Sequence, residues 1–275
     1  MAALALAPTG ARAQTAGSDT LAAQPRQPMV VTRALMLGVG HAQTLDTYIS
    51  TEKYRGTALT FVADVQRQRR QSAWSRRLLY RADVAYTHNR ADNANDMAAY
   101  FRFGYGAMRH WTLGGGHIDL AAGAQADVLA GFLYNTRGGN NPAQATMALN
   151  ITPMAQASWR FHIRQVPCQA VAGVEAPVAG LMFAPHYGQS YYEIFTQGNY
   201  DHNLVATWTG NTPSVRQMLG IDIQLGHTAL RLGYMGEVRQ AKVNGLRQHL
   251  YTHQAMIGVV RRFSICKLFP THEKE

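Results

Sequence analysis

The sequence is poor in cysteine and has no long apolar run. Its two cysteines, Cys168 and Cys266, fit no metal-ligand or redox spacing, so we expect no metal and no cofactor. A disulfide between them needs Cα atoms within about 7 Å, and several predicted strands separate them. No stretch of 18 or more apolar residues occurs, which excludes a transmembrane helix. A membrane-spanning form of this chain therefore has to be a closed barrel.

Lysine is also scarce, although the chain is basic. It has 26 Lys and Arg against 16 Asp and Glu, a net charge of +10. The few lysines lie in predicted loops or the tail, so nearly every cation on a predicted strand is arginine. These arginines are spread along alternating segments and form no dense patch, which argues against nucleic acid as a partner. Arginine pairs bidentately with carboxylates, which is typical of an enclosed, ion-paired interior.

Two long segments between His117 and Ile163 carry apolar side chains at every second residue. In the first, the apolar positions from Ile118 to Tyr134 alternate with polar ones such as Asp119 and Asp127. This period of two predicts strands, because a helix would scatter the polar residues around its axis. The strands of soluble sandwiches usually have about 5–6 residues. These segments are longer than the roughly 9–11 residues that a tilted strand needs to cross a bilayer.

The same alternation recurs along the chain and predicts ten strands. We therefore predict an all-β fold, a single antiparallel up-and-down transmembrane β-barrel, with both termini inside, short turns at one end and longer loops at the other. Twelve strands are the alternative, if Leu204–Thr209 crosses by itself. The other predicted strands are Arg33–Ala42, Thr57–Arg67, Trp74–Thr87, Met97–Tyr105, Pro167–Ala184, Val215–Leu225, Leu230–Arg239 and Gln248–Phe263. The predicted longer loops include 43–56, 185–213 and 241–247.

The N-terminus suggests export. Met1–Ala13 is a short apolar segment with an Ala-x-Ala-like end, which indicates the remnant of a signal peptide; a chance match is the alternative, since the segment lacks a basic start. Residues 14–32, rich in Ala, Gln, Thr and Pro, predict a flexible leader. Residues 33–264 are then the barrel and residues 265–275 a periplasmic tail. We expect an outer-membrane location, with membrane lipid and lipopolysaccharide as surroundings.

The polar faces of the predicted strands carry charges of both signs. Buried charges need partners, so we predict a lumen crossed by Arg–carboxylate pairs. A ten-stranded barrel is narrower than the open channels of sixteen or more strands, and we expect no large pore. The predicted network consists of Asp64, Arg81, Asp83, Arg102, Asp119, Asp127, Arg160, Glu175, Asp222, Arg231, Glu237 and Arg239.

The longest predicted loop holds candidate catalytic residues. A hydrolase at the extracellular rim would need a nucleophile, a base and an orienting group within reach of one another. The candidates match neither the His-x-Ser of outer-membrane lipid hydrolases nor the Asp-x-His of ten-stranded proteases. We therefore expect a non-enzymatic binding, structural or narrow-passage role, with a lipid or peptide hydrolase as the alternative. The candidates are His186, Ser190, Glu193, Asp201 and His202.

The predicted external loops also form a candidate binding surface. Tyrosines offer rigid amphipathic area suited to a glycan or a protein. An aromatic girdle at the membrane interface is the alternative for those near strand ends. Arginine and asparagine side chains suit anionic lipopolysaccharide. The candidates are Arg137, Asn140, Asn141, Tyr187, Tyr191, Tyr192, Tyr200 and Asn203.

Four stretches of the chain carry a resemblance to a known family. They are Leu45–Ser50 with Glu52–Tyr54, Phe132–Ala143, Tyr187–Phe195 with Gly198–Asn203, and Met256–Ser264. These stretches resemble an uncharacterised outer-membrane β-barrel family of gut Bacteroidales, a domain family of unknown function. The similarity runs from about residue 33 to about residue 264. It implies a barrel fold and an outer-membrane location, and it brings no catalytic residues to this chain.

Overall fold

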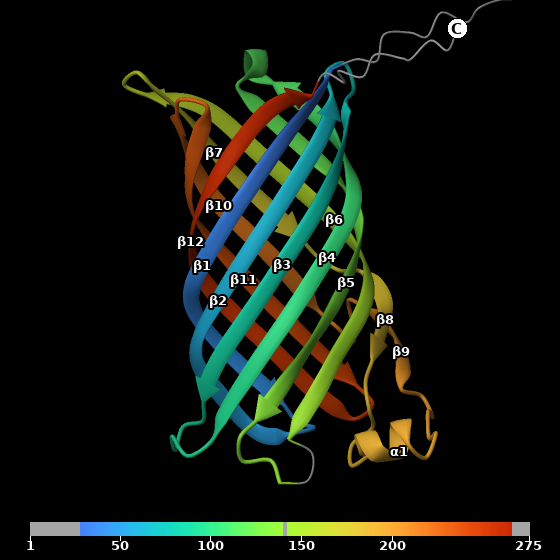
Figure 1. The fold of residues 1–275 in the computed structure, drawn as a ribbon. Coiled ribbons are helices and arrows are strands. Elements are labelled where there is room, and N and C mark those ends of the chain that lie inside the picture. Colours follow the sequence, from blue (N-terminus) through green and yellow to red (C-terminus); the bar gives the residue numbers. More distant parts are fainter. Residues whose placement is uncertain (1–27, 140–141, 266–275) are drawn as a thin grey trace, which may run out of the picture.

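Alternating apolar and polar residues form ten long antiparallel strands that close into a barrel (Figure 1). The structure is a computed structural model, which describes residues 28–139 and 142–265. Each long strand pairs with its neighbour in the sequence, and the last pairs with the first. The ten strands are β1 (Met29–Asp46), β2 (Ser50–Arg69), β3 (Trp74–His88), β4 (Asn95–Leu113), β5 (Ile118–Asn135), β6 (Ala143–Ile163), β7 (Val166–Glu175), β10 (Ser214–Leu225), β11 (Thr228–Val243) and β12 (Leu246–Ile265).

Most large apolar side chains face outward and the charged side chains at mid-height face inward, as the sequence predicted, although Arg76 and Arg109 share the outward face near one end. Leu37, Phe61 and Ile151 are exposed on the outer wall, whereas Arg102 and Asp127 are buried inside the barrel. This inverts the arrangement of a soluble protein, in which apolar side chains form the interior. The ten-stranded fold is confirmed, and two short extra strands are added to it.

The two ends of the barrel differ in what they carry. We call the end where β1 starts and β12 ends the terminal end, and the opposite end the loop end; Figure 1 shows the terminal end at the top. Exposed aromatic side chains lie on the outer wall near both ends. Trp74, Trp111 and Trp159 are near the terminal end, and Tyr86 and Tyr134 are near the loop end. Between them the outer wall is apolar, with aliphatic side chains such as Leu37 and Ile151 and some aromatic ones such as Phe61 and Phe101.

Several strands are longer than predicted, so two predicted loops are wrong. β1 begins at Met29, inside the predicted leader, because residues 29–32 pair with β2 and β12. Residues 47–49 alone join β1 to β2, in place of the predicted loop 43–56, and residues 244–245 join β11 to β12, in place of 241–247. The polar strand ends resemble loops in the sequence, although Thr44 and Tyr54 are buried. The predicted signal peptide and tail lie outside the described residues, apart from residue 265, which ends β12.

The predicted strand Pro167–Ala184 is interrupted. Its first part is β7 and its second part is β8 (Ala179–Phe183). Ala176 and Val178 still donate backbone hydrogen bonds to β6, at 3.1 and 3.0 Å. Pro177, between them, has no N–H to offer the neighbour on its other side. There the partner changes from β10 to the short strand β9 (Leu204–Trp208). This is the segment for which the sequence allowed a separate crossing strand.

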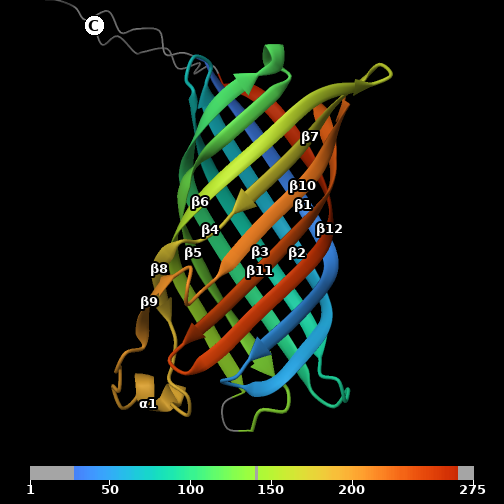
Figure 2. The same cartoon turned by 180° about the vertical axis from the view of Figure 1, so that it is seen from behind.

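β8, β9 and the helix α1 (Tyr191–Phe195) form an extension at the loop end, which both views place beside the barrel wall (Figures 1 and 2). Residues 184–203 connect β8 to β9 and contain α1. The connections 89–94 and 136–142 are of intermediate length, and several others are tight. Asn244 and Gly245, both with positive φ, make the two-residue turn between β11 and β12, a conformation that favours Asn-Gly. A short 3-10 turn, η1 (Gly114–Gly116), joins β4 to β5. No helix within the described ranges is long and apolar enough to span a bilayer.

Candidate functional site

A continuous network of ion pairs crosses the barrel interior, and we call it the ionic layer. Glu237 on β11 binds two arginines from the opposite wall, Arg81 on β3 and Arg102 on β4, each at 2.9 Å. Arg102 also lies 3.6 Å from Asp127 on β5. The full layer comprises Asp64, Arg77, Arg81, Asp83, Arg102, Asp127, Glu175, Arg216 and Glu237.

The second half of the ionic layer returns across the barrel. Arg216 on β10 contacts Asp127 at 3.3 Å and Glu175 on β7 at 2.9 Å. Glu175 also pairs with Arg77 on β3, which in turn binds Asp64 at 2.8 Å. The layer thus joins the β2–β5 wall to the β7, β10 and β11 wall through side chains alone.

Every charged side chain of the ionic layer has an ion-pair partner, and those at its centre, Arg102, Asp127 and Glu237, are buried. Asp127 is completely buried, and it accepts hydrogen bonds from Thr152 and, at 3.3 Å, from Asn150 as well as pairing with two arginines. A buried ion pair is tolerated when its remaining hydrogen-bonding positions are satisfied, and breaking it strands an uncompensated charge. The layer is therefore a rigid partition at mid-height of the barrel.

Side chains fill the half of the lumen between the ionic layer and the loop end. Tyr100, Leu129, Leu133 and Leu250 pack together there. The guanidinium of Arg239 lies over the Tyr100 ring, 4.2 Å from its centre, which is cation–π geometry. A cavity of only about 70 Å³ is left in this half.

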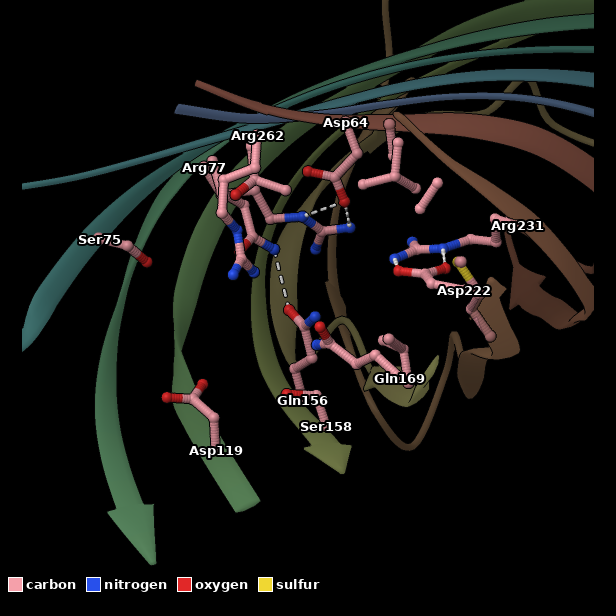
Figure 3. A pocket seen from close by; sticks show the side chains of 18 of the residues that line it. Asp64, Ser75, Arg77, Asp119, Gln156, Ser158, Gln169, Asp222, Arg231 and Arg262 are labelled. Carbon is pink, nitrogen blue, oxygen red and sulfur yellow. Dashed lines mark hydrogen bonds and ion pairs between the residues drawn. The ribbon is translucent and has the colours of Figure 1, made fainter. Parts of the chain in front are cut away.

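The other half of the lumen is open. A cavity of about 760 Å³ extends from the ionic layer to the terminal end, and we call it the terminal-end cavity. Figure 3 shows its interior, where Arg231 makes a bidentate pair with Asp222 at 2.5 and 2.7 Å. Nearer the mouth, His110 contacts Asp119 at 2.8 Å. The barrel is therefore a cup that opens at the terminal end.

The loop-end extension is anchored to the rim of the barrel. The Tyr191 hydroxyl accepts a hydrogen bond from the Ala145 N–H at 2.6 Å and donates one to Gln144 at 2.9 Å. The Tyr48 hydroxyl donates to the Gln189 carbonyl at 2.8 Å, and its ring packs edge-on against Tyr191. Burial raises the pKa of Tyr191 to about 12 and also raises that of Tyr48. Both hydroxyls therefore stay protonated and available as donors at neutral pH.

The five candidate catalytic residues lie in the loop between β8 and β9. Ser190 caps α1 and forms a reciprocal capping box with Glu193. The His186 ring contacts the Asp201 carbonyl at 3.0 Å, and His202 pairs with the Asp201 carboxylate at a highly exposed position. Each side chain thus has a contact within the loop itself, and Ser190 has its hydroxyl engaged with the Glu193 N–H.

The candidate binding residues divide into an exposed and an anchoring group. Tyr187, Tyr192 and Tyr200 are exposed, whereas Tyr191 and Asn203 hold the loop in place. Arg137 is exposed and donates to Asn93 at 3.0 Å. Asn140 and Asn141 lie outside the described residues. Sequence reasoning did not include Phe195, an exposed ring of α1 beside the tyrosines.

Most of the predicted charge network lies inside the barrel, with two differences. Arg160 donates to the Gly116 carbonyl at 2.9 Å, and Arg239 stacks on Tyr100, so neither has a carboxylate ion pair within the described ranges. Arg160 lies near the terminal end, where a backbone carbonyl accepts its hydrogen bond, and Arg239 lies over the face of the Tyr100 ring. Conversely, Arg77 and Arg216 were left out of the prediction. The alternation in the sequence could have identified them, because both occupy inward-facing positions of their strands.

These features define a class: a closed ten-stranded antiparallel β-barrel with apolar side chains outside and an ion-paired interior. A family model described as a protein of unknown function, DUF3316, matches residues 1–269. The chain belongs to this family. The resemblance to an uncharacterised family is thereby supported, whereas a Bacteroidales origin is not part of what the match shows. No curated protein matches the sequence.

Solved β-barrels are similar to this chain at low identity. The β domain of the Bordetella autotransporter BrkA has a TM-score of 0.43 and 11% identity, covering 85% of this chain and 99% of its own. The translocator domain of NalP from Neisseria meningitidis has a TM-score of 0.36 and 8% identity, covering 85% and 88%. The P. putida toluene transporter TodX has a TM-score of 0.20 and 9% identity, covering 86% and 90%. Likeness at this level says nothing about function.

Proposed function

We propose that this chain is an outer-membrane β-barrel, closed to solutes, that binds a ligand at its loop end without catalysis. The exposed apolar outer wall, with tryptophan and tyrosine side chains near both ends, supports insertion into a bilayer. Strands of 15 to 21 residues, such as β3 and β6, are long enough to cross it with a tilt. The ionic layer and the filled half of the lumen support a closed interior.

The observation that carries the binding role is the anchored loop-end extension. Tyr48 and Tyr191 fix the connection between β8 and β9, while Tyr187, Tyr192 and Tyr200 stay exposed on it. Ordered, exposed tyrosines give contact area at low entropic cost, because their backbone is already held in place. Aromatic faces pack against sugar rings, so we propose a surface glycan as the ligand, with lipopolysaccharide the first to test.

The contacts of the candidate catalytic residues support a non-enzymatic role. Ser190 and Glu193 cap α1, and His186 and His202 contact Asp201. Among the described residues, the Ser190 hydroxyl has no hydrogen bond to a histidine that could activate it as a nucleophile. Phospholipase and peptidase assays test this part of the proposal. Hydrolysis by the wild type that disappears in His186→Ala or His202→Ala would contradict it.

A binding assay tests the glycan proposal. The purified barrel, held in nonionic detergent, is titrated with lipopolysaccharide, and the triple variant Tyr187→Ala, Tyr192→Ala, Tyr200→Ala is compared with the wild type. We expect binding at least tenfold weaker in the triple variant. The matched control replaces three exposed aromatic residues near the terminal end, Trp74, Trp111 and Trp159, with alanine. Equal binding by the wild type and the tyrosine variant would refute the proposed site.

A further inference from the structure

The terminal-end cavity has more positive than negative side chains in its wall. Its volume of about 760 Å³ falls in the range of small-molecule sites, about 300–1,000 Å³. Among the described residues, eight arginines and four carboxylates line it. The cavity therefore carries an excess of positive charge, which neither the ionic layer nor the proposed binding role at the loop end explains.

All four carboxylates of this cavity are already paired. Asp64 binds Arg77, and Glu175 binds Arg77 and Arg216. Asp222 is engaged by Arg231, and Asp119 by His110. Arg81 has its own carboxylates, Asp83 and Glu237, deeper in the barrel. Four lining arginines have no carboxylate ion pair among the described residues: Arg69, Arg70, Arg160 and Arg262.

Two of these arginines lie on inward-facing files. Arg160 follows the buried Ser158 on β6, and Arg262 follows the buried Val260 on β12. Arg160 uses one N–H for the Gly116 carbonyl, which leaves the other donors of its guanidinium free. Arg262 has no hydrogen bond or ion pair to any residue that the structure describes, and it lines the cavity (Figure 3).

Arg160 and Arg262 both line this one cavity, so their positive charges share a partly enclosed space and repel each other. Asp119 and Asp222 attract Arg262, but they are committed to His110 and Arg231. Like charges in a partly enclosed space, where the dielectric constant is lower than in water, raise the energy of the empty site. An anion between two guanidinium groups removes this repulsion and gains charge-assisted hydrogen bonds, with bidentate geometry for carboxylate and phosphate.

Neutral donors and acceptors also line the cavity, beside an apolar part of the wall that includes Met36, Val62 and Leu79. Gln156 and Gln169 point into the cavity beside Ser158 (Figure 3). Such side chains can bind the hydroxyl or carbonyl groups of an anionic ligand. Arg69 and Arg70, exposed where β2 ends, place further positive charge at the mouth, where it draws anions inward.

We propose that the terminal-end cavity is a binding site for a small polar anion with a carboxylate or phosphate group, held between Arg160 and Arg262. The ionic layer forms the floor of this site, so the anion is bound at the terminal end and does not cross the barrel. The site lies at the opposite end from the proposed glycan surface and is independent of it.

Titration calorimetry on the full chain in nonionic detergent tests this site. Citrate and inorganic phosphate are the anionic probes, and glucose is the neutral probe. We expect saturable binding of at least one anion, none of glucose, and at least tenfold weaker binding by the double variant Arg160→Gln, Arg262→Gln. The control Arg90→Gln, Arg247→Gln removes the same charge from exposed positions at the loop end and should bind like the wild type. An equal loss in the control, or no saturable binding of either anion, would overturn the proposal.

A second measurement needs no variant, so a folding defect cannot obscure the result. Phenylglyoxal modifies accessible arginines, and mass spectrometry reports the extent at each position. We expect the bound anion to protect Arg160 and Arg262 and to leave Arg90 and Arg247 unchanged. Unchanged modification of Arg160 and Arg262 at a saturating concentration of citrate and of phosphate would refute the site.

Discussion

Glu237 is one of the bridging carboxylates of the ionic layer, because it pairs with both Arg81 and Arg102. Glu237→Gln keeps the shape of the side chain and leaves two buried guanidinium groups without this carboxylate. Removing one partner of a buried ion pair costs about 3–5 kcal/mol, and we expect a loss of this size in the free energy of unfolding. Urea titration of the barrel in detergent, followed by circular dichroism, measures it.

The matched control for this variant is Asp201→Asn. It also removes the carboxylate of an ion pair, the one with His202, but the Asp201 side chain is 73% exposed. Exposed pairs contribute about 0–1 kcal/mol, so we expect little change. Equal losses for the two variants would show that burial of the Glu237 pair has no special energetic role.

Tyr191 gives the loop-end extension a dependence on high pH. Its pKa of about 12 arises from burial, whereas an unfolded tyrosine ionises near pH 10. The neutral hydroxyl is therefore favoured by the fold, and its stabilising contribution is present below pH 10 and is lost as the pH rises towards 12. We expect the tyrosinate absorbance of the wild type minus Tyr191→Phe to rise near pH 12. A difference spectrum that rises near pH 10 would contradict the anchoring role.

At the scale of elements, β6 shows how the outer wall relates to the membrane. Ile151 lies near its middle and Ile163 is its last residue, and both face outward, at 57% and 55% exposure. An arginine at mid-membrane on the lipid face of a barrel costs about 2–4 kcal/mol, and one near the interface about 0–1 kcal/mol. We therefore expect Ile151→Arg to destabilise the barrel in lipid vesicles much more than Ile163→Arg.

Unfolding by urea in phospholipid vesicles measures this difference between the two variants. The pair is closely matched, because the strand, the replaced side chain and its exposure are shared. If both variants lose the same stability, the aliphatic wall of β6 does not lie in the apolar part of a bilayer.

The sequence predicts the faces of the strands far better than their ends. Alternation correctly predicted that Asp64, Arg102 and Asp127 lie inside, because successive side chains of a strand point to opposite faces of the sheet. It misplaced the β1–β2 connection, because strands that continue beyond the apolar band carry polar residues on both faces, as a loop does. The change of partner at Pro177 was not predictable, because it depends on which neighbouring strand the missing Pro177 N–H would have faced. That requires the register of three strands.

The candidate sites were predictable to different degrees. Inward arginines follow from strand parity, so Arg77 and Arg216 were within reach of the sequence. The cavity between the ionic layer and the terminal end was not, because it depends on how side chains from ten strands fill a common space. Likewise, the anchoring role of Tyr191 depends on Gln144 and Ala145, which lie 47 and 46 residues away along the chain.

The whole molecule is a cup with a floor, and this predicts its behaviour in a planar bilayer. The ionic layer closes the lumen, and Tyr100 with its neighbours fills the space beyond it. We expect no steady ion current through the wild type. The triple variant Tyr100→Ala, Arg102→Ser, Glu237→Ser removes side chains from both barriers and should conduct. A steady wild-type current, insensitive to these substitutions, would exclude the layer as the barrier.

The seam between β1 and β12 has a consequence for assembly. The first and last strands share an 18-residue register, from Met29 opposite Ile265 to Asp46 opposite Gln248. Until β12 pairs with β1, the partly formed sheet has two edge strands with unpaired backbone N–H and C=O groups. Such edges can pair with other chains. Closure also joins the most distant parts of the sequence, a slow step. A chain truncated before residue 246 lacks β12 and cannot close the barrel. We expect such a chain to aggregate before it inserts into a membrane.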